Sequence, residues 1–394
     1  MADKQKLALC LGGGGSKGAF EAGAVQALMD MGYQFDIVTG CSIGAFNGAM
    51  FVQNQFDRAR QLWDKITISG VIADGVNIEP SIEKLIEQKD AILPFIKNTL
   101  QSGVDISPLK DLMEEYIDPD KMLASDIDFG IVTVSFPQMK PVFKTKSQLN
   151  RDNLRSWLLA SASCFPAFPM CEIDGNFYLD GAYYDNLPID LAFEMGADHV
   201  FAIDLKDQPD HEHYYHHPCV TYIKSTYDLG SFLYFEQGSI QANITMGYLD
   251  TCKKLGKYKG NLFAFDGFDS EMVQTIANKF CRRLVDLERP FNPQEDSIVS
   301  RLMESFDLSK SIVNKKDPSA LATFINALEM CMQKLQADPL QVYDLSQAIN
   351  LVRSGYDMDI SLPIGNEETR KKMKSFTEDF ILAELIKETT LSLV

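Results

Sequence analysis

The 394-residue sequence has no run of 18 consecutive apolar residues, so it predicts no helix long enough to cross a membrane. The apolar run near its N-terminus is also too short for a secretory signal peptide. Its eight cysteines form no C-x-x-C pair and no disulfide-rich spacing, which is typical of small buried side chains in a reducing compartment. We therefore expect a cytoplasmic protein.

Positively charged residues are also outnumbered: the sequence has 37 Lys and Arg residues against 55 Asp and Glu residues, so the net charge is −18. A polyanion is a poor partner for such a chain, so no nucleic acid is expected to bind. The sequence shows no internal repeat and no low-complexity linker. Hydrophobic residues make up 45% of it, which at this length allows one large domain with an appendage.

Histidines are few, and four of the five lie in one short segment, HEHYYHH at 211–217. This segment follows Pro209 and has the composition of a loop. It offers no framework of cysteines or carboxylates at fixed helical spacing, so we expect no metal site there.

What the sequence does contain is a pair of glycine-rich turns between residues 7 and 48. The apolar run at 7–11 predicts a buried strand that ends in four consecutive glycines, and the helix after it stops at Gly32. A second strand, at 35–38, runs into Gly40-Cys41-Ser42-Ile43-Gly44, a G-x-S-x-G pattern. Its glycines allow a strand to turn at once into a helix with the serine exposed at the bend, so Ser42 is the candidate nucleophile.

The first glycine turn has two interpretations. The sequence from Gly13 to Gly18 fits G-x-G-x-x-G, with Asp36 near the position of a ribose-binding acid, which favours a Rossmann-like nucleotide-binding protein. Alternatively, its N–H groups form an oxyanion hole at a helix N-terminus, with Lys17 adding positive charge. The second interpretation uses both turns together and is preferred.

Together these segments resemble the patatin-like phospholipase family, which combines a G-G-G-x-[RK]-G loop, a G-x-S-x-G serine and a later D-G-[GA]. Here the motifs are 13–18, 40–44 and Asp180-Gly181-Ala182, and the stretches 160–169 and 186–188 also look like that family. The resemblance covers roughly residues 5–265. It implies an α/β fold, a three-layer α/β/α sandwich. The sequence departs from the family in Lys17, where many members carry Arg with its bidentate fork.

The resemblance also implies a function, a serine acyl hydrolase that cleaves lipid acyl esters as a phospholipase A, lysophospholipase or acylglycerol lipase does. In it Ser42 is the nucleophile and Asp180 the proton acceptor. The implied oxyanion or substrate-binding residues are Gly13, Gly14, Gly15, Lys17, Gly18 and Ile43, and the remaining motif residues are Gly40, Gly44, Gly181 and Ala182. No metal or organic cofactor is implied. A lipid substrate implies transient contact with a membrane surface.

Other functions stay open: an acyltransferase, or a catalytically silent scaffold with the same fold. The order Ser42, Asp180, then a histidine also matches the α/β-hydrolase triad. In that fold the elbow follows several strands, whereas here it follows the second, so we expect no histidine to take part.

The rest of the chain predicts a domain over 1–267, with a helical insertion at about 66–126, and a helical C-terminal region over 268–394. The expected helices are at 43–65, 81–88, 94–100, 107–116, 152–162, 189–195 and 225–254. The expected strands are at 128–136, 140–144, 199–205 and 261–265, with a strand pair over 171–179 that turns at 174–176.

Overall fold

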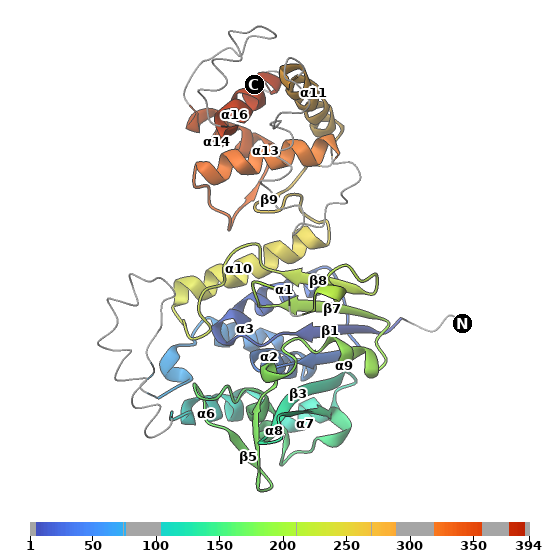
Figure 1. Cartoon of the computed structure of the whole chain (residues 1–394), viewed down its shortest axis with the longest axis vertical. Helices are drawn as coiled ribbons and strands as arrows, with labels where there is room; N and C mark the ends of the chain where they lie inside the picture. Colours follow the sequence, from blue (N-terminus) through green and yellow to red (C-terminus); the bar gives the residue numbers. More distant parts are fainter. Residues whose placement is uncertain are drawn as a thin grey trace. The chain divides into compact units, whose positions relative to one another are not determined.

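The computed structural model describes residues 5–73, 75, 104–209, 211–268, 270–288, 319–356 and 378–390. The chain divides into two compact units, Met1–Thr251 and Cys252–Val394 (Figure 1). Residues 252–267, which the sequence grouped with the first domain, thus belong to the second unit. The helices expected at 81–88 and 94–100 lie outside the described residues.

The first unit is built on a mixed sheet in the order β5-β6-β3-β2-β1-β7-β8, with β4 paired to the other edge of β3 (Figure 1). Strands β3, β2, β1, β7 and β8 run parallel, and β4, β5 and β6 join by antiparallel pairs. The strands are β1 Leu7–Leu11, β2 Ile37–Gly40, β3 Asp128–Phe136, β4 Lys140–Thr145, β5 Cys171–Ile173, β6 Asn176–Asp180, β7 His199–Asp204 and β8 Val220–Lys224. Strand β8 is absent from the sequence-based expectation.

Helices cover both faces of this sheet. The helices of the first unit are α1 Gly18–Asp30, α2 Ile43–Val52, α3 Phe56–Trp63, α6 Ser107–Tyr116, α7 Pro119–Ala124, α8 Leu154–Ser161, α9 Ile189–Glu194 and α10 Gln237–Lys254. On β1, Ala8 and Cys10 pack in one cluster with α9, whereas Leu11 faces Gly48 of α2. Successive side chains of a strand point to opposite faces, so a continuous apolar run suits a strand buried on both sides. The expected three-layer α/β/α sandwich is confirmed.

Two of the expected helices have different bounds. The helix expected to continue to about residue 65 is interrupted at Asn54, whose φ is 57°, and becomes α2 and α3. The helix expected from residue 225 begins only at Gln237, since Gly230 with φ 81° turns the chain. Carboxylate oxygens of Glu236 then accept the N–H groups of Gly238 and Ser239, which starts α10.

Helices α1 and α10 approach so closely that glycine is required on both. A Cβ on Gly23 would lie 1.8 Å from the carbonyl oxygen of Ile244, and one on Gly247 would lie 1.9 Å from that of Phe20. The clashing atoms are backbone, which cannot move aside as a side chain can. These two glycines therefore fix how α10 lies on α1.

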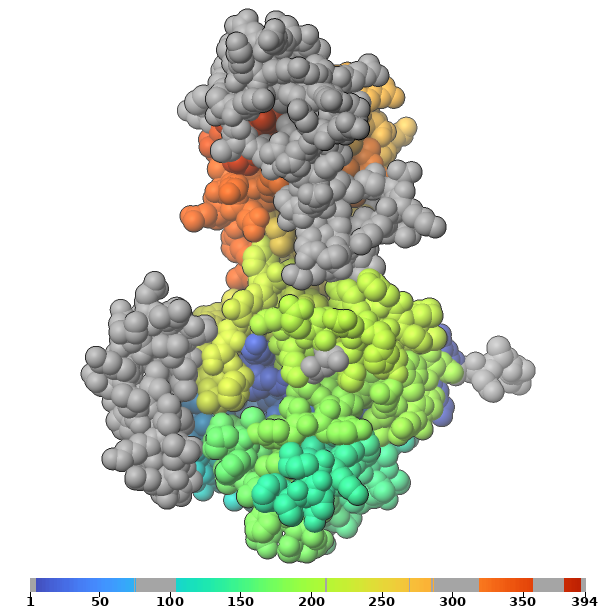
Figure 2. All heavy atoms as spheres, in the orientation of Figure 1, coloured from blue at the N-terminus to red at the C-terminus, as the bar shows by residue number. Residues whose placement is uncertain are grey.

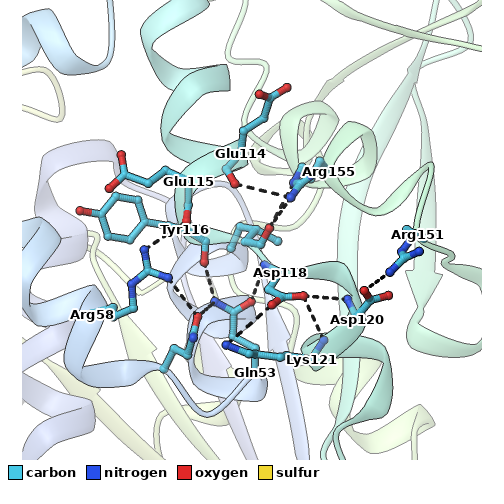
Figure 3. Close-up of polar contacts among 12 residues, drawn as sticks. Gln53, Arg58, Glu114, Glu115, Tyr116, Asp118, Asp120, Lys121, Arg151 and Arg155 are labelled. Carbon is cyan, nitrogen blue, oxygen red and sulfur yellow. Dashed lines mark hydrogen bonds and ion pairs between the residues drawn. The ribbon is translucent and has the colours of Figure 1, made fainter.

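The described part of the insertion is fastened near the C-terminal end of α2 (Figure 3). The Gln53 side chain donates to the Tyr116 carbonyl at 2.5 Å and accepts the Asp118 N–H at 2.9 Å. Arg155 of α8 donates to the Ile117 carbonyl at 2.7 Å, and Arg58 donates to the Glu115 carbonyl at 3.2 Å. Helix α2 is about 15 Å long, so these bonds are made at the end opposite Ser42.

The second unit has a core of its own, formed by apolar residues between Phe263 and Ile386. Its described helices are α11 Glu271–Glu288, α13 Ala320–Lys334, α14 Leu345–Gly355 and α16 Glu378–Thr389. The expected helical character of this region is confirmed, and one short strand joins the helices: β10 Val342–Tyr343 pairs in parallel with β9 Ala264–Phe265. In the described ranges of the whole chain, no helix is both long and apolar enough to span a membrane.

Candidate active site

Ser42 stands at a sharp turn between β2 and α2. Its φ of 54° and ψ of −122° are uncommon for any residue except glycine. A Cβ on Gly40 would lie 2.7 Å from backbone atoms of Gly44 and Ala45, and one on Gly44 would lie 2.4 Å from the Leu11 carbonyl oxygen. The two motif glycines thus allow the bend that the G-x-S-x-G spacing predicts.

A second serine holds the backbone of this turn. The hydroxyl of Ser161, at the end of α8, accepts the Ser42 N–H at 3.0 Å and donates to the Val132 carbonyl of β3 at 2.8 Å. Ser161 is completely buried. It ties the strained nucleophile turn to the central strand of the sheet.

Asp180 lies at the end of β6, which pairs with the same edge of β3 that β2 uses. Its Oδ1 accepts the Ala182 N–H at 2.9 Å and the Cys41 thiol at 3.5 Å. Gly181 allows the close approach, because a Cβ there would lie 2.4 Å from the Val132 carbonyl oxygen and 2.9 Å from the Cys41 sulfur. The D-G-A segment therefore brings its carboxylate beside the elbow, although 138 positions separate Ser42 and Asp180 in the sequence.

The protonation of Asp180 is set by burial, since only 2% of the residue is exposed. Burial raises the pKa of its carboxyl to about 6, and hydrogen bonds from Ala182, the Ser42 hydroxyl and Cys41, with the charge of Lys206, lower it in part. A carboxylate with this pKa is ionised at neutral pH and is a better base than an exposed one. Burial also raises the pKa of the neighbouring Cys41 thiol, which keeps that thiol protonated and unreactive.

The glycine loop is anchored from Asn186. The Gly13 N–H donates to the Asn186 carbonyl at 3.0 Å, and the Asn186 amide donates back to the Gly13 carbonyl at 3.0 Å. The Gly13 N–H is therefore already hydrogen-bonded and cannot donate to an oxyanion. A Cβ on Gly13 would lie 3.2 Å from the Cβ of Ser42, so the loop passes directly beside the elbow.

Three backbone donors remain available around Ser42. Within the described ranges, the N–H groups of Gly14, Gly15 and Ile43 have no hydrogen-bond partner. Gly15 has φ 57° and passes so near Phe232 that a Cβ would lie 2.2 Å from its carbonyl oxygen. Free N–H groups beside a nucleophile are what an oxyanion hole requires.

Lys17 and Gly18 connect the loop to α1. Lys17 is half-buried, its N–H donates to the Gly14 carbonyl at 3.2 Å, and its ammonium group makes no ion pair in the described part of the chain. Gly18 leaves room for the Ile43 side chain, which a Cβ would approach to 2.5 Å. In the first unit, Figure 2 shows dark blue atoms of the N-terminal part of the chain in a hollow between green and yellow segments.

The nucleotide-binding interpretation fails on the position of Asp36. This residue precedes β2, and its carboxylate accepts the Leu7 N–H at 3.1 Å, at the start of β1. The glycine loop follows the other end of β1, roughly 13 Å or more away at the rise of a strand. Asp36 is therefore too far from the loop to hold a ribose bound there.

The structure gives hydrogen-bond partners for His199 and His211, the first two histidines after Asp180. His199 pairs in register with Leu7, at the end of the sheet away from Ser42, and bonds Thr221 at 2.8 Å. His211 Nε2 lies 2.9 Å from the Asp185 carboxylate, one residue before the loop anchor Asn186. Among the described residues, no group of three or more His, Cys, Asp or Glu side chains is arranged to hold a metal ion.

The sequence alone predicts no role for Ser161 or Asn186. In the structure, the side chains of both residues make hydrogen bonds to the backbone of the site. The resemblance marked their surroundings, 160–169 and 186–188, but each role depends on contacts with residues far away in the sequence. Ser161 bonds backbone 119 and 29 positions away, and Asn186 bonds backbone 173 positions away.

Comparisons with known proteins agree with this site. Residues 9–193 match the family model of patatin-like phospholipase. Patatin-like phospholipase domain-containing protein 7 of Mus musculus is 30% identical over 213 residues, which cover 53% of this chain and 14% of the mouse protein. Lysophospholipase nte1 of Aspergillus terreus is 28% identical over 206 residues, 51% of this chain and 12% of that protein. The chain thus matches only 12–14% of the length of these relatives.

Among solved structures, VipD from Legionella pneumophila overlaps with 98% of this chain and 92% of its own, at 12% identity and a TM-score of 0.42. This overlap is too weak to support a conclusion about function. The family match is specific, because it spans the glycine loop, the elbow and Asp180. Residues 9–193, just under half of the 394-residue chain, therefore match the patatin-like phospholipase family model and form a domain of that kind.

Proposed function

We propose that the protein is a serine acyl hydrolase that cleaves lipid acyl esters through a dyad of Ser42 and Asp180. One observation carries the proposal: a serine in a strained elbow lies beside a buried carboxyl whose pKa is raised to about 6. The base is thus ionised at neutral pH and adjacent to the hydroxyl that it must deprotonate.

The reaction follows from the positions of these groups. Asp180 accepts the Ser42 proton while Oγ attacks the ester carbonyl, and the N–H groups of Gly14, Gly15 and Ile43 bind the oxyanion. The intermediate collapses to an acyl-serine, and the leaving alcohol takes the proton from Asp180. A water molecule then gives its proton to Asp180 and attacks the acyl group, which releases the fatty acid and restores the Ser42 hydroxyl.

The lipid substrate is supported by the family match and by the names of the relatives, a patatin-like phospholipase and a lysophospholipase. Contact with a lipid surface is supported by exposed aromatic residues that flank the catalytic segment. Phe165, Tyr183 and Tyr184 are 49%, 47% and 59% exposed, and Phe143 meets Tyr184 at a ring distance of 6.3 Å. A cytoplasmic location is supported by the eight cysteines, none of which forms a disulfide.

The test uses a fluorophosphonate probe and a panel of a phospholipid, a lysophospholipid and a triacylglycerol. Wild type is expected to label covalently and to release fatty acid from at least one lipid, and Ser42→Ala is expected to do neither. Ser147→Ala, a change of an exposed serine, is the matched control and should behave as wild type. Labelling that persists in Ser42→Ala would place the nucleophile elsewhere, and a wild type that neither labels nor hydrolyses would indicate a silent scaffold.

A further inference from the structure

A buried carboxyl that the dyad does not use lies directly behind the glycine loop. Glu21, in the first turn of α1, is fully buried, as are its neighbours Ala19, Phe20 and Ala22. Burying a carboxyl costs free energy that an apolar side chain of the same size would not. Such a group calls for an explanation in terms of what it contacts.

Glu21 is one end of a chain of hydrogen bonds through three helices. The Asn47 amide, in α2, donates to Glu21 Oε2 at 2.8 Å and to the Gly18 carbonyl at 3.1 Å. Trp63 Nε1, at the end of α3, donates to Asn47 Oδ1 at 3.1 Å. The Asn47 side chain is thereby fully hydrogen-bonded and has one orientation. The other carboxyl oxygen, Glu21 Oε1, is buried without a hydrogen-bond partner among the described residues, and the Gly12 N–H at the start of the glycine loop donates to the Ile203 carbonyl at 3.1 Å.

These bonds join the two segments that carry the free N–H groups. Gly14 and Gly15 lie between Gly12 and Gly18, which flank the glycine loop, and Ile43 is the first residue of the helix that holds Asn47. The donors come from separate segments, so their spacing depends on how α1 is fixed to α2. A misplacement of about 1 Å at such a site can cost about 10²-fold in rate.

We propose that Glu21, acting through Asn47, is a positioning residue that fixes the glycine-loop donors relative to the Ile43 N–H around the reacting carbonyl. The inference rests on the proposed function, because it concerns the oxyanion hole of the same site. It assigns Glu21 no contact with substrate.

Burial favours the neutral form of this carboxyl. Burial raises the pKa of Glu21 well above its ordinary value, and the Asn47 hydrogen bond and the nearby Gly12 N–H lower it only in part. The titratable groups that face it are Asp204 of β7, whose charge raises the pKa further, and the buried thiol of Cys10 in β1. Glutamine, which is neutral and has the same shape and an acceptor oxygen, should therefore replace glutamate.

The experiment compares wild type, Glu21→Gln and Glu21→Leu by the second-order rate of fluorophosphonate labelling, by kcat and KM on the best ester, and by Tm. Glu21→Gln is expected to stay within about threefold of wild type. Glu21→Leu keeps the volume but loses the acceptor, so labelling and kcat should fall together by about 10-fold to 100-fold, with KM changed by less than about threefold. Leu28→Ala, a cavity in the same helix away from the site, should lower Tm but leave the labelling rate unchanged.

The outcomes separate the inference from the proposed function. If wild type is labelled and Glu21→Leu is labelled as fast, the positioning role is wrong while the hydrolase stands. If Glu21→Leu does not fold, Asn47→Ser in its place should show the same loss, and wild-type labelling rates in that variant would overturn the inference. If the labelling rate and kcat fall as far in Glu21→Gln as in Glu21→Leu, the inference that the Glu21 carboxyl is neutral is wrong. An unlabelled wild type would reject the hydrolase itself.

Discussion

At the scale of single residues, the proposed chemistry depends on one carboxyl, that of Asp180, whose pKa burial raises to about 6. Only the ionised form of Asp180 can accept the Ser42 proton. We therefore expect kcat/KM to rise about tenfold per pH unit below about pH 6 and to level off above it. The measurement is a pH profile of ester hydrolysis, and a profile that is flat from pH 4.5 to pH 8 would contradict Asp180 as the base.

The same shift links Asp180 to stability. Because its pKa is raised in the folded state, its contribution to stability is fully present below its unfolded pKa, near 4, and is lost as the pH rises through about 6. Asn cannot ionise, so Asp180→Asn should gain up to about 3 kcal/mol over wild type between pH 4 and pH 7, the equivalent of about two pKa units. Activity should be lost in the same variant.

Denaturant melts at the two pH values test this linkage. Asp174→Asn, a change of an exposed carboxylate in the turn between β5 and β6, is measured in parallel as the control. If the difference in unfolding free energy between wild type and Asp180→Asn is the same at both pH values, burial does not raise the pKa of the Asp180 carboxyl.

At the scale of helices and strands, the packing of α1 is limited by the two glycines that face α10. A methyl group on Gly247 would lie 1.9 Å from the Phe20 carbonyl oxygen, and both partners are helix backbone. Gly247→Ala should therefore lower the free energy of unfolding by about 1–3 kcal/mol through overpacking.

A matched change elsewhere isolates this effect. At Gly70 the nearest atom to an added Cβ is the Thr67 hydroxyl at 3.7 Å, an ordinary contact. Gly70→Ala should thus stay within about 0.5 kcal/mol of wild type. Equal unfolding free energies for the two variants, measured by urea denaturation, would mean that α10 can move away from α1 without cost.

The sequence predicts elements well where a local pattern decides them. Strands β1 and β3 match their expected bounds, because uninterrupted apolar and β-branched runs end there at glycine or proline. The short strand β8 was missed, since its place depends on pairing with β7 rather than on its own residues. Likewise β10 has only two residues, and its partner β9 lies almost 80 positions away.

In the candidate site, too, features that a local sequence pattern decides could be predicted, whereas features that depend on long-range contacts could not. The tight backbone turns at Ser42 and Asp180 could be predicted because the glycines beside these residues mark a backbone that tolerates no Cβ, and such glycines stand at fixed spacing in the motifs. The roles of Asn186 and Glu21 could not, because each depends on a side-chain contact between elements that the sequence does not place together. Gly13, expected at the oxyanion hole, instead bonds Asn186.

At the scale of the whole molecule, the two compact units have separate cores. The aromatic residues Phe263, Phe265 and Phe268 are each 1% exposed and belong to the core that continues through α11, α13, α14 and α16. Among the residues that the structure describes, no member of that core precedes Leu262. The sheet of the first unit is instead enclosed by its own helices, with Ala8, Cys10, Val200 and Ala202 buried against α9. We infer that the first unit can fold without the second.

This inference predicts opposite behaviour for two fragments that differ by 14 residues. Fragment 1–256 ends just after α10 and carries none of the second core, so it should be a folded monomer that a fluorophosphonate labels at Ser42. Fragment 1–270 retains the three phenylalanines without the helices that bury them, and their exposed apolar surface should make it aggregate. Size-exclusion chromatography and thermal melts distinguish the two. Aggregation of both fragments would show that the first unit requires residues 257–394 to fold. Equal solubility of both would mean that the three phenylalanines are buried in another place.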